Sequence, residues 1–212
     1  MWLVGWYGYI VLNDYGNQHT CYTPKTDDSM CNNISVSVSS DGMYVYIIAS
    51  DCNYNNYWLH KSASYGASFI KTSVNSLDGY SSVQVSIDGR YVIVNSNYNQ
   101  DIYISNDYGL TFTYKPAFIS NNGGATTFPQ VAISKSGQYI YSNKMYSTSY
   151  GSSFQSWNSA ILSLGLYARS VACSSTGQYV LFIYFSNGNI MRYLSSDYGG
   201  TFQSSGTFSN FS

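Results

Sequence analysis

An eight-residue segment with the pattern Ser-x-Asp-Tyr-Gly-x-Thr-Phe recurs along the chain, and this repeat constrains the fold more than any other feature. Its copies, from the clearest to the most eroded, are Ser105–Phe112, Ser195–Phe202, Ser62–Phe69, Ser147–Phe154 and Leu12–His19. The Tyr-Gly pairs in these copies end at residues 16, 66, 109, 151 and 199, so successive copies lie 50, 43, 42 and 48 residues apart. Periods of about 40–45 residues are typical of propeller blades with four strands each.

A second motif runs in phase with the first. It combines an alternating apolar strand, a tight turn that contains Gly, and a new strand that opens with Tyr, and together these indicate a β-hairpin. The four copies are Val36–Val45, Val83–Val92, Val131–Ile140 and Val171–Val180. Two motifs that share one period predict a repeated structural unit.

The two motifs together give four strands per repeat. In the third repeat we expect these strands at Ser82–Ser86, Tyr91–Asn95, Asp101–Ser105 and Thr111–Lys115. Four antiparallel strands of this length form one blade of a β-propeller. The sequence therefore predicts an all-β fold built from four-stranded antiparallel blades.

The N-terminal repeat is incomplete, because only three strands fit into it: Met1–Tyr7, Tyr9–Asn13 and Gln18–Thr23. We expect Thr207–Ser212 to supply the missing first strand, which would close the ring and remove an open sheet edge. The prediction is one five-bladed β-propeller domain over residues 1–212, with an open arc or a domain-swapped dimer as the alternatives. The expected blades are 1–24 plus 206–212, 33–74, 81–116, 129–158 and 169–205.

Composition indicates a folded β protein with a largely uncharged surface. Hydrophobic residues make up 44% of the chain and Tyr occurs 24 times, whereas only 9% of residues are charged and Glu is absent. Disordered chains show the opposite composition. The net charge of −1 leaves no basic face for nucleic acid, and no apolar run approaches the roughly 18–20 residues of a membrane span. Met1–Tyr7 lacks a basic region and a cleavage site, so we interpret it as a strand and not as a signal peptide.

The phrase Ser-x-Asp-x-Gly-x-Thr-Phe resembles the Asp box of bacterial neuraminidase (sialidase-type) repeats, which also occur in viral and microbial surface proteins. The resemblance covers nearly the whole chain as repeats, and it implies a fold and not an activity. It implies that the Ser and Asp side chains bind turn backbone, that Gly adopts a positive φ, and that the aromatic ring packs between sheets. The matching residues are Asp14, Gly16, Ser105, Asp107, Gly109, Thr111, Phe112, Ser195, Asp197, Gly199, Thr201 and Phe202. Ser64 and Ser149 stand where the box has Asp, and we expect them to preserve a weaker turn.

Propeller topology also predicts where binding would occur. The hairpins and the boxes share one face of the ring, while longer and more variable segments share the opposite face. Variable loops on a regular scaffold commonly carry function, and Tyr with short acids suits a glycan or protein surface. The candidate binding residues are Asp27, Asp28, Tyr54, Asp78, Tyr80 and Tyr98, with plain solvated loops as the alternative interpretation.

The four cysteines have two different settings. Cys173 aligns with inward-facing positions of the first strand in other repeats, so we expect a buried core thiol. The remaining three lie at the variable face, where Cys21–Cys31 or Cys31–Cys52 could form one disulfide. A zinc site is the rival interpretation, but there is no Cys-x-x-Cys pair and the two histidines, His19 and His60, fall on strands. We therefore expect no metal and no cofactor.

A sialidase-like glycosidase is the sharpest catalytic hypothesis, and the residues argue against it. Such enzymes need an arginine triad, a Tyr nucleophile assisted by Glu, and an Asp acid/base. The only arginines are Arg90, Arg169 and Arg192, with Arg90 on the wrong face, and Glu is missing. No phosphate-binding loop, dinucleotide fingerprint or Ser-His-Asp arrangement is present. We expect that the chain is not an enzyme.

The remaining hypotheses are a recognition module and a building block. The favoured one is a non-catalytic module that binds a glycan or a protein through the variable face. The alternative is a structural component of a virion or an extracellular surface layer, in which propellers assemble through Tyr-rich faces as homo-oligomers. Low charge and abundant Tyr, Ser and Asn lead us to expect an extracellular or virion-surface location.

Overall fold

The structure, a computed structural model, consists of β-strands joined by turns. It describes residues 3–4, 10–13, 19–22, 32–50, 57–74, 77, 81–96, 102–115, 130–142, 145–157, 168–186 and 189–208. Within these ranges no helix is both long and apolar enough to span a bilayer.

Four of the sheets are four-stranded and antiparallel, and we number them blades I to IV in chain order. Blade I consists of β4 (Asn32–Val38), β5 (Val45–Ser50), β6 (Tyr57–Ser62) and β7 (Ile70–Lys71). Blade II consists of β8 (Ser82–Val85), β9 (Val92–Asn95), β10 (Ile102–Ser105) and β11 (Thr113–Lys115). Blade III consists of β12 (Val131–Ile133), β13 (Ile140–Ser142), β14 (Met145–Ser147) and β15 (Gln155–Ser156). Blade IV consists of β16 (Ala168–Cys173), β17 (Val180–Ser186), β18 (Asn189–Ser195) and β19 (Gln203–Phe208).

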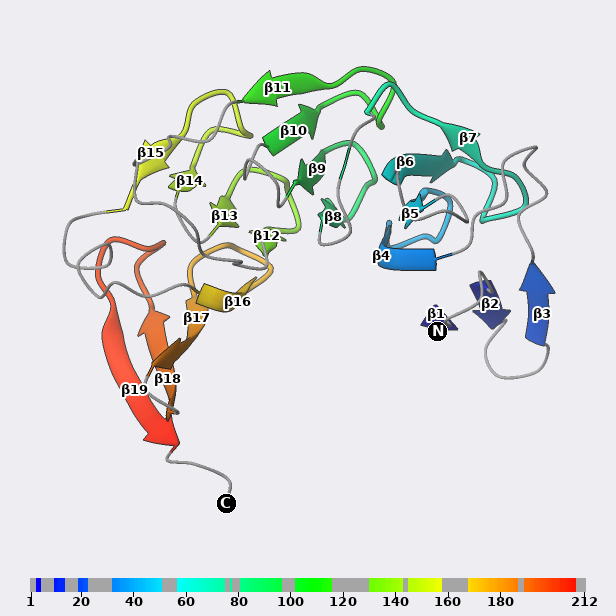
Figure 1. The fold of residues 1–212 in the computed structure, drawn as a ribbon. Coiled ribbons are helices and arrows are strands. Elements are labelled where there is room, and N and C mark those ends of the chain that lie inside the picture. The colour runs from blue at the N-terminus through cyan, green and yellow to red at the C-terminus, as the bar shows by residue number, and fades with distance from the viewer. Residues whose placement is uncertain are drawn as a thin grey trace.

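The four blades are arranged side by side in an arc, with the first strand of each blade on the inner side and the fourth on the outer side (Figure 1). The inner strands β4, β8, β12 and β16 pack against one another in this order. This is the architecture of a β-propeller, and it confirms the predicted all-β fold of four-stranded antiparallel blades.

The strands of blade II begin and end within two residues of the predicted positions. Their register pairs Val85 with Val92 and Ser105 with Val92, so the hairpin motif and the box motif both lie at the same end of the blade. The regular alternation of apolar residues sets this register, because a slip of one residue would turn the buried side chains of β9 towards the wrong neighbour.

A fifth, three-stranded sheet precedes blade I and consists of β1 (Leu3–Val4), β2 (Ile10–Asn13) and β3 (His19–Tyr22). It has one strand fewer than the blades, as the sequence predicts. Thr207 and Phe208, which we expected in the closing strand, instead pair with Met191 and Ile190 at the end of blade IV. Among the described residues no strand pair joins the two ends of the arc, so five blades and ring closure remain predictions.

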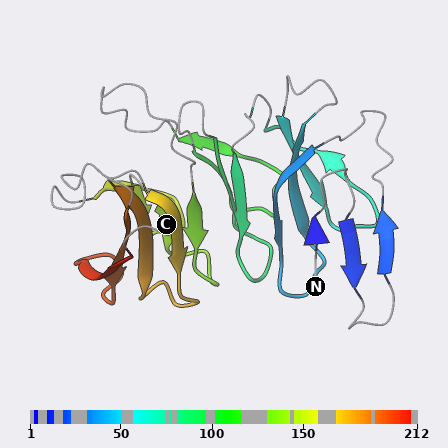
Figure 2. The ribbon, with the colours of Figure 1, turned by 60° about the horizontal axis from the view of Figure 1, so that its bottom comes forward.

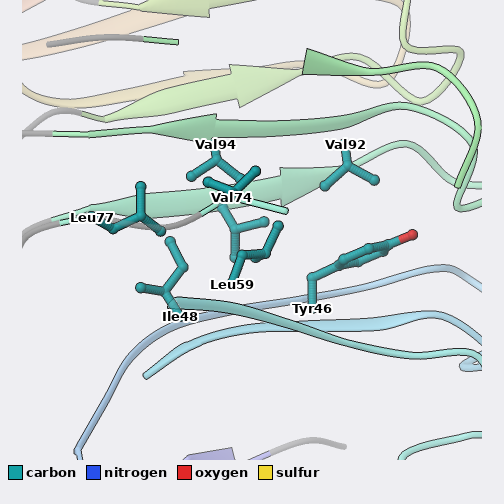
Figure 3. Close-up of a cluster of buried hydrophobic side chains, with 8 residues drawn as sticks. Tyr46, Ile48, Leu59, Val74, Leu77, Val92 and Val94 are labelled. Carbon is teal, nitrogen blue, oxygen red and sulfur yellow. The ribbon is translucent and has the colours of Figure 1, made fainter. Parts of the chain in front are cut away.

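The core lies between neighbouring sheets. Tyr46, Ile48 and Leu59 of blade I face Val92 and Val94 of blade II, and all five side chains are fully buried (Figure 3). Burial of each such aliphatic side chain stabilises the fold by about 1.5–3 kcal/mol. Blades II and III each contribute one face to the cluster before them and the other face to the cluster after them.

A chain of backbone hydrogen bonds also joins the blades where the first and second strands meet. We call these four segments hairpin turns: Ser39–Gly42, Ser86–Gly89, Ser134–Gly137 and Ser174–Gly177. The N–H of Ser40 donates to the carbonyl of Ile87, that of Ile87 donates to Lys135, and that of Lys135 donates to Ser175, each over 2.9 Å. Figure 2 shows the strands of adjacent blades running side by side above these turns. Identical contacts at each junction therefore place all hairpin turns at one face of the arc.

Candidate recognition surface

The eight-residue repeats form turns, which we call box turns, and each is organised by a buried serine. In the turn at Ser105–Phe112 the Ser105 Oγ accepts the N–H of Gly109 over 2.8 Å and donates to the Asp107 carboxylate over 2.7 Å. Asp107 accepts the N–H of Thr111 over 2.9 Å and its hydroxyl over 2.5 Å. The ring of Phe112 packs against the core between blades I and II. Ser105 and Asp107 thus bind the backbone of their own turn in this copy.

The last box turn repeats the same geometry. The N–H of Gly199 donates to Ser195 Oγ over 2.8 Å, and Asp197 accepts both the N–H and the hydroxyl of Thr201, over 2.9 and 2.7 Å. Phe202 packs against the core between blades III and IV. Asp14 and Gly16 of the first copy lie outside the described residues, so their role remains a prediction.

Serine replaces the box aspartate in two turns and preserves a reduced set of bonds. Ser149 Oγ accepts the N–H of Ser153 over 3.2 Å and lies 2.9 Å from its hydroxyl. Ser64 does the same with Ser68, over 3.2 and 3.1 Å. These bonds are longer than those of Asp107 and involve no charged group, and charge-assisted hydrogen bonds are the stronger kind.

The box carboxylates are structural anions. Burial raises the pKa of Asp107, but hydrogen bonds from Thr111, Ser105 and Leu110 outweigh it and lower the pKa to about 2. Hydrogen bonds from the N–H of Thr201, from Ser195 and from the Thr201 hydroxyl lower the pKa of Asp197 to about 2 as well. Both groups stay ionised at neutral pH, and their oxygens are already engaged by the turn.

The sequence did not reveal that the tyrosine before each box glycine adopts a left-handed backbone conformation. The φ angles of Tyr65, Tyr108, Tyr150 and Tyr198 are 56°, 59°, 58° and 60°. Such values are rare for a bulky residue and cost of order 1 kcal/mol. Each of these tyrosines donates its N–H to a carbonyl two residues before the second strand, and this hydrogen bond offsets the cost of the backbone conformation. In blade II, for example, the N–H of Tyr108 donates to the Arg90 carbonyl over 3.0 Å. The unvarying Tyr-Gly pair was the signal available in the sequence.

These tyrosines stack on tyrosines of the preceding blade. The rings of Tyr44 and Tyr108 have centroids 5.0 Å apart, as do those of Tyr91 and Tyr150, and the rings of Tyr139 and Tyr198 lie 4.8 Å apart. The first member of each pair also covers a hairpin glycine of the next blade, since a Cβ on Gly137 would lie 2.4 Å from Tyr91. We call these six residues the tyrosine row. The equivalent tyrosines outside the row, Tyr65 and Tyr179, have no such ring partner among the described residues and are 57% and 50% exposed.

Exposed apolar side chains concentrate at the turn face, which we define as the hairpin turns, the box turns and the tyrosines that pack on them. Seven of the ten large exposed hydrophobic residues in the described ranges lie there. They are Tyr65, Ile87, Tyr108, Leu110, Tyr150, Tyr179 and Tyr198. Exposed apolar side chains that gather on one face often mark an interaction site. The turn face was expected to be purely structural, and these side chains give it the composition of a recognition surface.

Cations and acids are interspersed with the tyrosines. The Arg90 guanidinium lies 5.4 Å from the centre of the Tyr91 ring and donates to the Asn106 carbonyl over 3.1 Å. Arg192 donates to the Ser205 carbonyl over 3.0 Å in blade IV, away from Arg90 in the fold.

In the part of the chain that the structure describes, no three His, Cys, Asp or Glu side chains lie close enough together to hold a metal ion.

Cys173 is a half-buried thiol in β16 that packs against the core between blades III and IV. Burial raises its pKa to about 11, so it stays protonated at neutral pH and behaves as an apolar side chain. This agrees with the expected core position. Cys31 and Cys52 lie outside the described residues, and the side chain of Cys21 does too, so the disulfide remains a prediction.

The six predicted binding residues of the variable face lie outside the described residues. They are Asp27, Asp28, Tyr54, Asp78, Tyr80 and Tyr98. The structure therefore neither groups nor separates them, and the described surface with the strongest recognition character is the turn face.

Solved structures similar to this chain are β-propeller-type proteins. One, described as YCF48 bound to D1 peptide, has a TM-score of 0.55 at 15% identity, and the match covers 96% of this chain and 77% of that one. An ancestral GH74 enzyme has a TM-score of 0.64 at 13% identity, covering 92% of this chain and 29% of the enzyme. TolB from Acinetobacter baumannii has a TM-score of 0.51 at 16% identity, covering 90% of this chain and 46% of TolB. Identities this low show the fold alone. No family model and no curated protein matches the sequence.

Proposed function

We propose that this chain is a non-catalytic recognition module that binds a polypeptide partner through the turn face. The observation that carries the proposal is the tyrosine row, in which stacked pairs recur at three junctions and leave the box tyrosines 36–42% exposed. Tyr is the residue that recognition surfaces favour most, because it offers a large rigid face and a hydroxyl at little cost in conformational entropy. The propeller in the YCF48 structure is bound to a peptide, which supports a polypeptide over a glycan as the partner.

The variable face remains the competing location for the same function, with glycan or protein as its ligand. Both locations are compatible with an extracellular or virion-surface protein, the setting that we propose from composition. The two faces lie at opposite ends of the strands, so substitutions can separate them.

The test is a binding screen of the purified chain against a peptide array and a glycan array. Tyr108→Asn and Tyr150→Asn remove two rings while keeping a residue type that tolerates positive φ. The matched control is Tyr114→Asn, since Tyr114 is 51% exposed but lies on β11, outside the turn face. We expect peptide binding that the first two substitutions weaken at least about tenfold, as for interface hot spots, and that the control leaves unchanged. Loss on Tyr54→Ala or Tyr98→Ala instead would move the site to the variable face, and glycan binding alone would overturn the polypeptide proposal.

The module is also proposed to be a closed five-bladed ring, because blade IV exposes half of a blade junction. Tyr46, Ile93 and Tyr141, at the second position of the second strand, are fully buried by the next blade, whereas Leu181 at the same position of β17 is only half-buried. Leu194 on β18 is 40% exposed. The N-terminal repeat carries the Tyr15-Gly16 pair that a partner for Tyr179 requires.

Closure is tested by light scattering together with a cross-link between cysteines introduced by Tyr179→Cys and Tyr15→Cys. A monomer that forms this cross-link within one chain supports the ring. A dimer cross-linked between chains would indicate a domain swap, and a monomer without the cross-link would indicate an open arc. Either result would leave the peptide-binding assay interpretable, because the three described tyrosine pairs do not depend on closure.

A further inference from the structure

A small hollow of about 200 Å³ opens between blades II and III beside the stacked Tyr91–Tyr150 pair. Its walls include Ile104, Thr113 and Lys115 from blade II and the box turn of blade III around Ser149 and Tyr150. It therefore borders the turn face, since residues of the two box turns form part of its wall, and it lies at the middle one of the three described junctions.

The hollow exists because the side chains at this junction are smaller or more flexible than those at its neighbours. At the junction of blades I and II, a Cβ on the box glycine Gly109 would lie 2.9 Å from the Tyr46 ring and 3.6 Å from Lys61. At the junction of blades III and IV, a Cβ on Gly199 would lie 2.7 Å from Trp157. Aromatic rings thus fill both of these junctions.

At the junction of blades II and III the box glycine meets aliphatic carbon only. A Cβ on Gly151 would lie 2.6 Å from Ile104 and 3.3 Å from Ile140. Trp157 of blade III is buried and follows the box residue Phe154 by three positions. The residue at the same position of blade II, three after Phe112, is Lys115. A half-buried, flexible cation thus stands where the next blade has a buried indole, and this cation lines the hollow.

The lining of the hollow favours an anion. Lys115 contributes a positive charge and the neighbouring side chains contribute hydroxyl groups, and no acidic residue is among those that line it. Asp107 is adjacent in sequence to the lining residue Asn106, but its carboxylate is engaged by Ser105 and Thr111. Among the described residues no ion pair to Lys115 is present.

The size of the hollow restricts the ligand. Pockets for drug-sized molecules measure roughly 300–1,000 Å³, so about 200 Å³ suits one side chain and not a whole small molecule. We propose that this hollow is an anchor pocket for a single carboxylate of the polypeptide partner, an Asp or Glu side chain, with its charge at Lys115 and its aliphatic stem along Ile104 and Tyr150. This inference rests on the proposed function, and it names the chemistry of the partner residue.

The test is an NMR titration of the full chain with three blocked amino acids. The probes are N-acetyl-glutamate N-methylamide, its glutamine analogue, and N-acetylglycine, whose only carboxylate is the main-chain one. We expect the glutamate compound to shift the Lys115 side-chain signals and the amides of residues 149–152. The glutamine analogue should bind about tenfold more weakly, because it lacks the charge. Stronger binding of N-acetylglycine would overturn the side-chain assignment in favour of a peptide C-terminus, and no shift with any probe would overturn the pocket.

Two variants and one control make the result specific. Lys115→Gln should abolish the shifts, and Lys115→Trp should fill the hollow as Trp157 does at the next junction, with the fold intact. The control Lys71→Gln changes an exposed lysine of β7, outside the turn face, and should leave the titration unchanged. Peptide-array binding that persists in Lys115→Gln, without probe shifts in the unaltered chain, would reject the pocket and retain the proposed function. Probe shifts without any peptide binding would retain the pocket and reject the proposed function.

Discussion

The rings of Tyr91 and Tyr150 stack with centroids 5.0 Å apart and an interplanar angle of 30°, although one opens the second strand of blade II and the other belongs to the box turn of blade III. The same relationship joins Tyr44 to Tyr108 and differs by only 0.2 Å in the pair Tyr139–Tyr198. A single contact is thus repeated from one junction to the next, so its energy can be measured once and compared across the arc.

We expect the Tyr91–Tyr150 pair to couple energetically. Aromatic pairs contribute about 0.5–1.5 kcal/mol beyond the area that they bury. A double-mutant cycle with Tyr91→Leu and Tyr150→Asn, followed by urea unfolding, should return a coupling free energy in this range. The pair Tyr103 and Tyr114, whose rings lie tilted within blade II with centroids 5.5 Å apart, provides a control cycle that does not cross a junction. A coupling near zero for Tyr91–Tyr150 would mean that the stacking follows from backbone geometry and adds no stability.

Substitution of a covered hairpin glycine should destabilise the fold more than substitution of an uncovered one. Gly137 and Gly42 have nearly the same φ, 82° and 78°, so alanine has a similar backbone cost at both. A Cβ on Gly137 would come within 2.4 Å of Tyr91, whereas the nearest described atom to a Cβ on Gly42 is 3.8 Å away. Overpacking of this kind costs about 1–3 kcal/mol. Gly137→Ala should therefore lower the free energy of unfolding by about that much more than Gly42→Ala, and equal losses would contradict the close contact.

Stability should fall in acid because of the box carboxylates. The folded-state pKa values of Asp107 and Asp197 are lowered to about 2, below the value of about 3.9 for an unfolded Asp. The stabilisation is thus present above about pH 4 and is lost as the pH falls through about 2. Urea midpoints measured between pH 2 and 5 should show this decline.

A variant carrying Asp107→Ser and Asp197→Ser isolates this effect, since serine forms the same turn at Ser64 and Ser149. It should be less stable at pH 5 and should lose less stability on acidification. An acid response identical to that of the unaltered chain would assign the decline to other carboxyl groups.

Truncation of Trp157 should be the most damaging single substitution at a junction. The indole is buried, stacks on Tyr146 at 4.5 Å and donates to the Ser142 carbonyl over 2.9 Å. Large-to-small changes of this kind cost about 3–5 kcal/mol. Thermal unfolding of Trp157→Ala should reveal such a loss, while Leu110→Ala, at a side chain 69% exposed, should change stability by no more than about 0.5 kcal/mol. Comparable midpoints for the two variants would show that the junction repacks.

The residues that hold the box turns were predictable because their partners are local. Ser105, Asp107 and Thr111 bond within seven residues of chain, and the alternation in β8 and β9 sets the strand register in the same way. The residues chosen for the variable face rested on loop variability and residue type, and they lie outside the described residues. The exposure of the box tyrosines was not predicted, because composition does not show which tyrosines remain exposed.

The sequence by itself determined the blades, since the hairpin and box motifs specify four strands through alternation, turn glycines and short-range hydrogen bonds. Only the tertiary structure decided how the blades use their tyrosines. The left-handed conformation of Tyr150 and its stacking on Tyr91 need partners about 60 residues apart, and no local pattern encodes that distance. The hollow at Lys115 follows from the same cause, because whether a junction is filled depends on side chains that two blades contribute together.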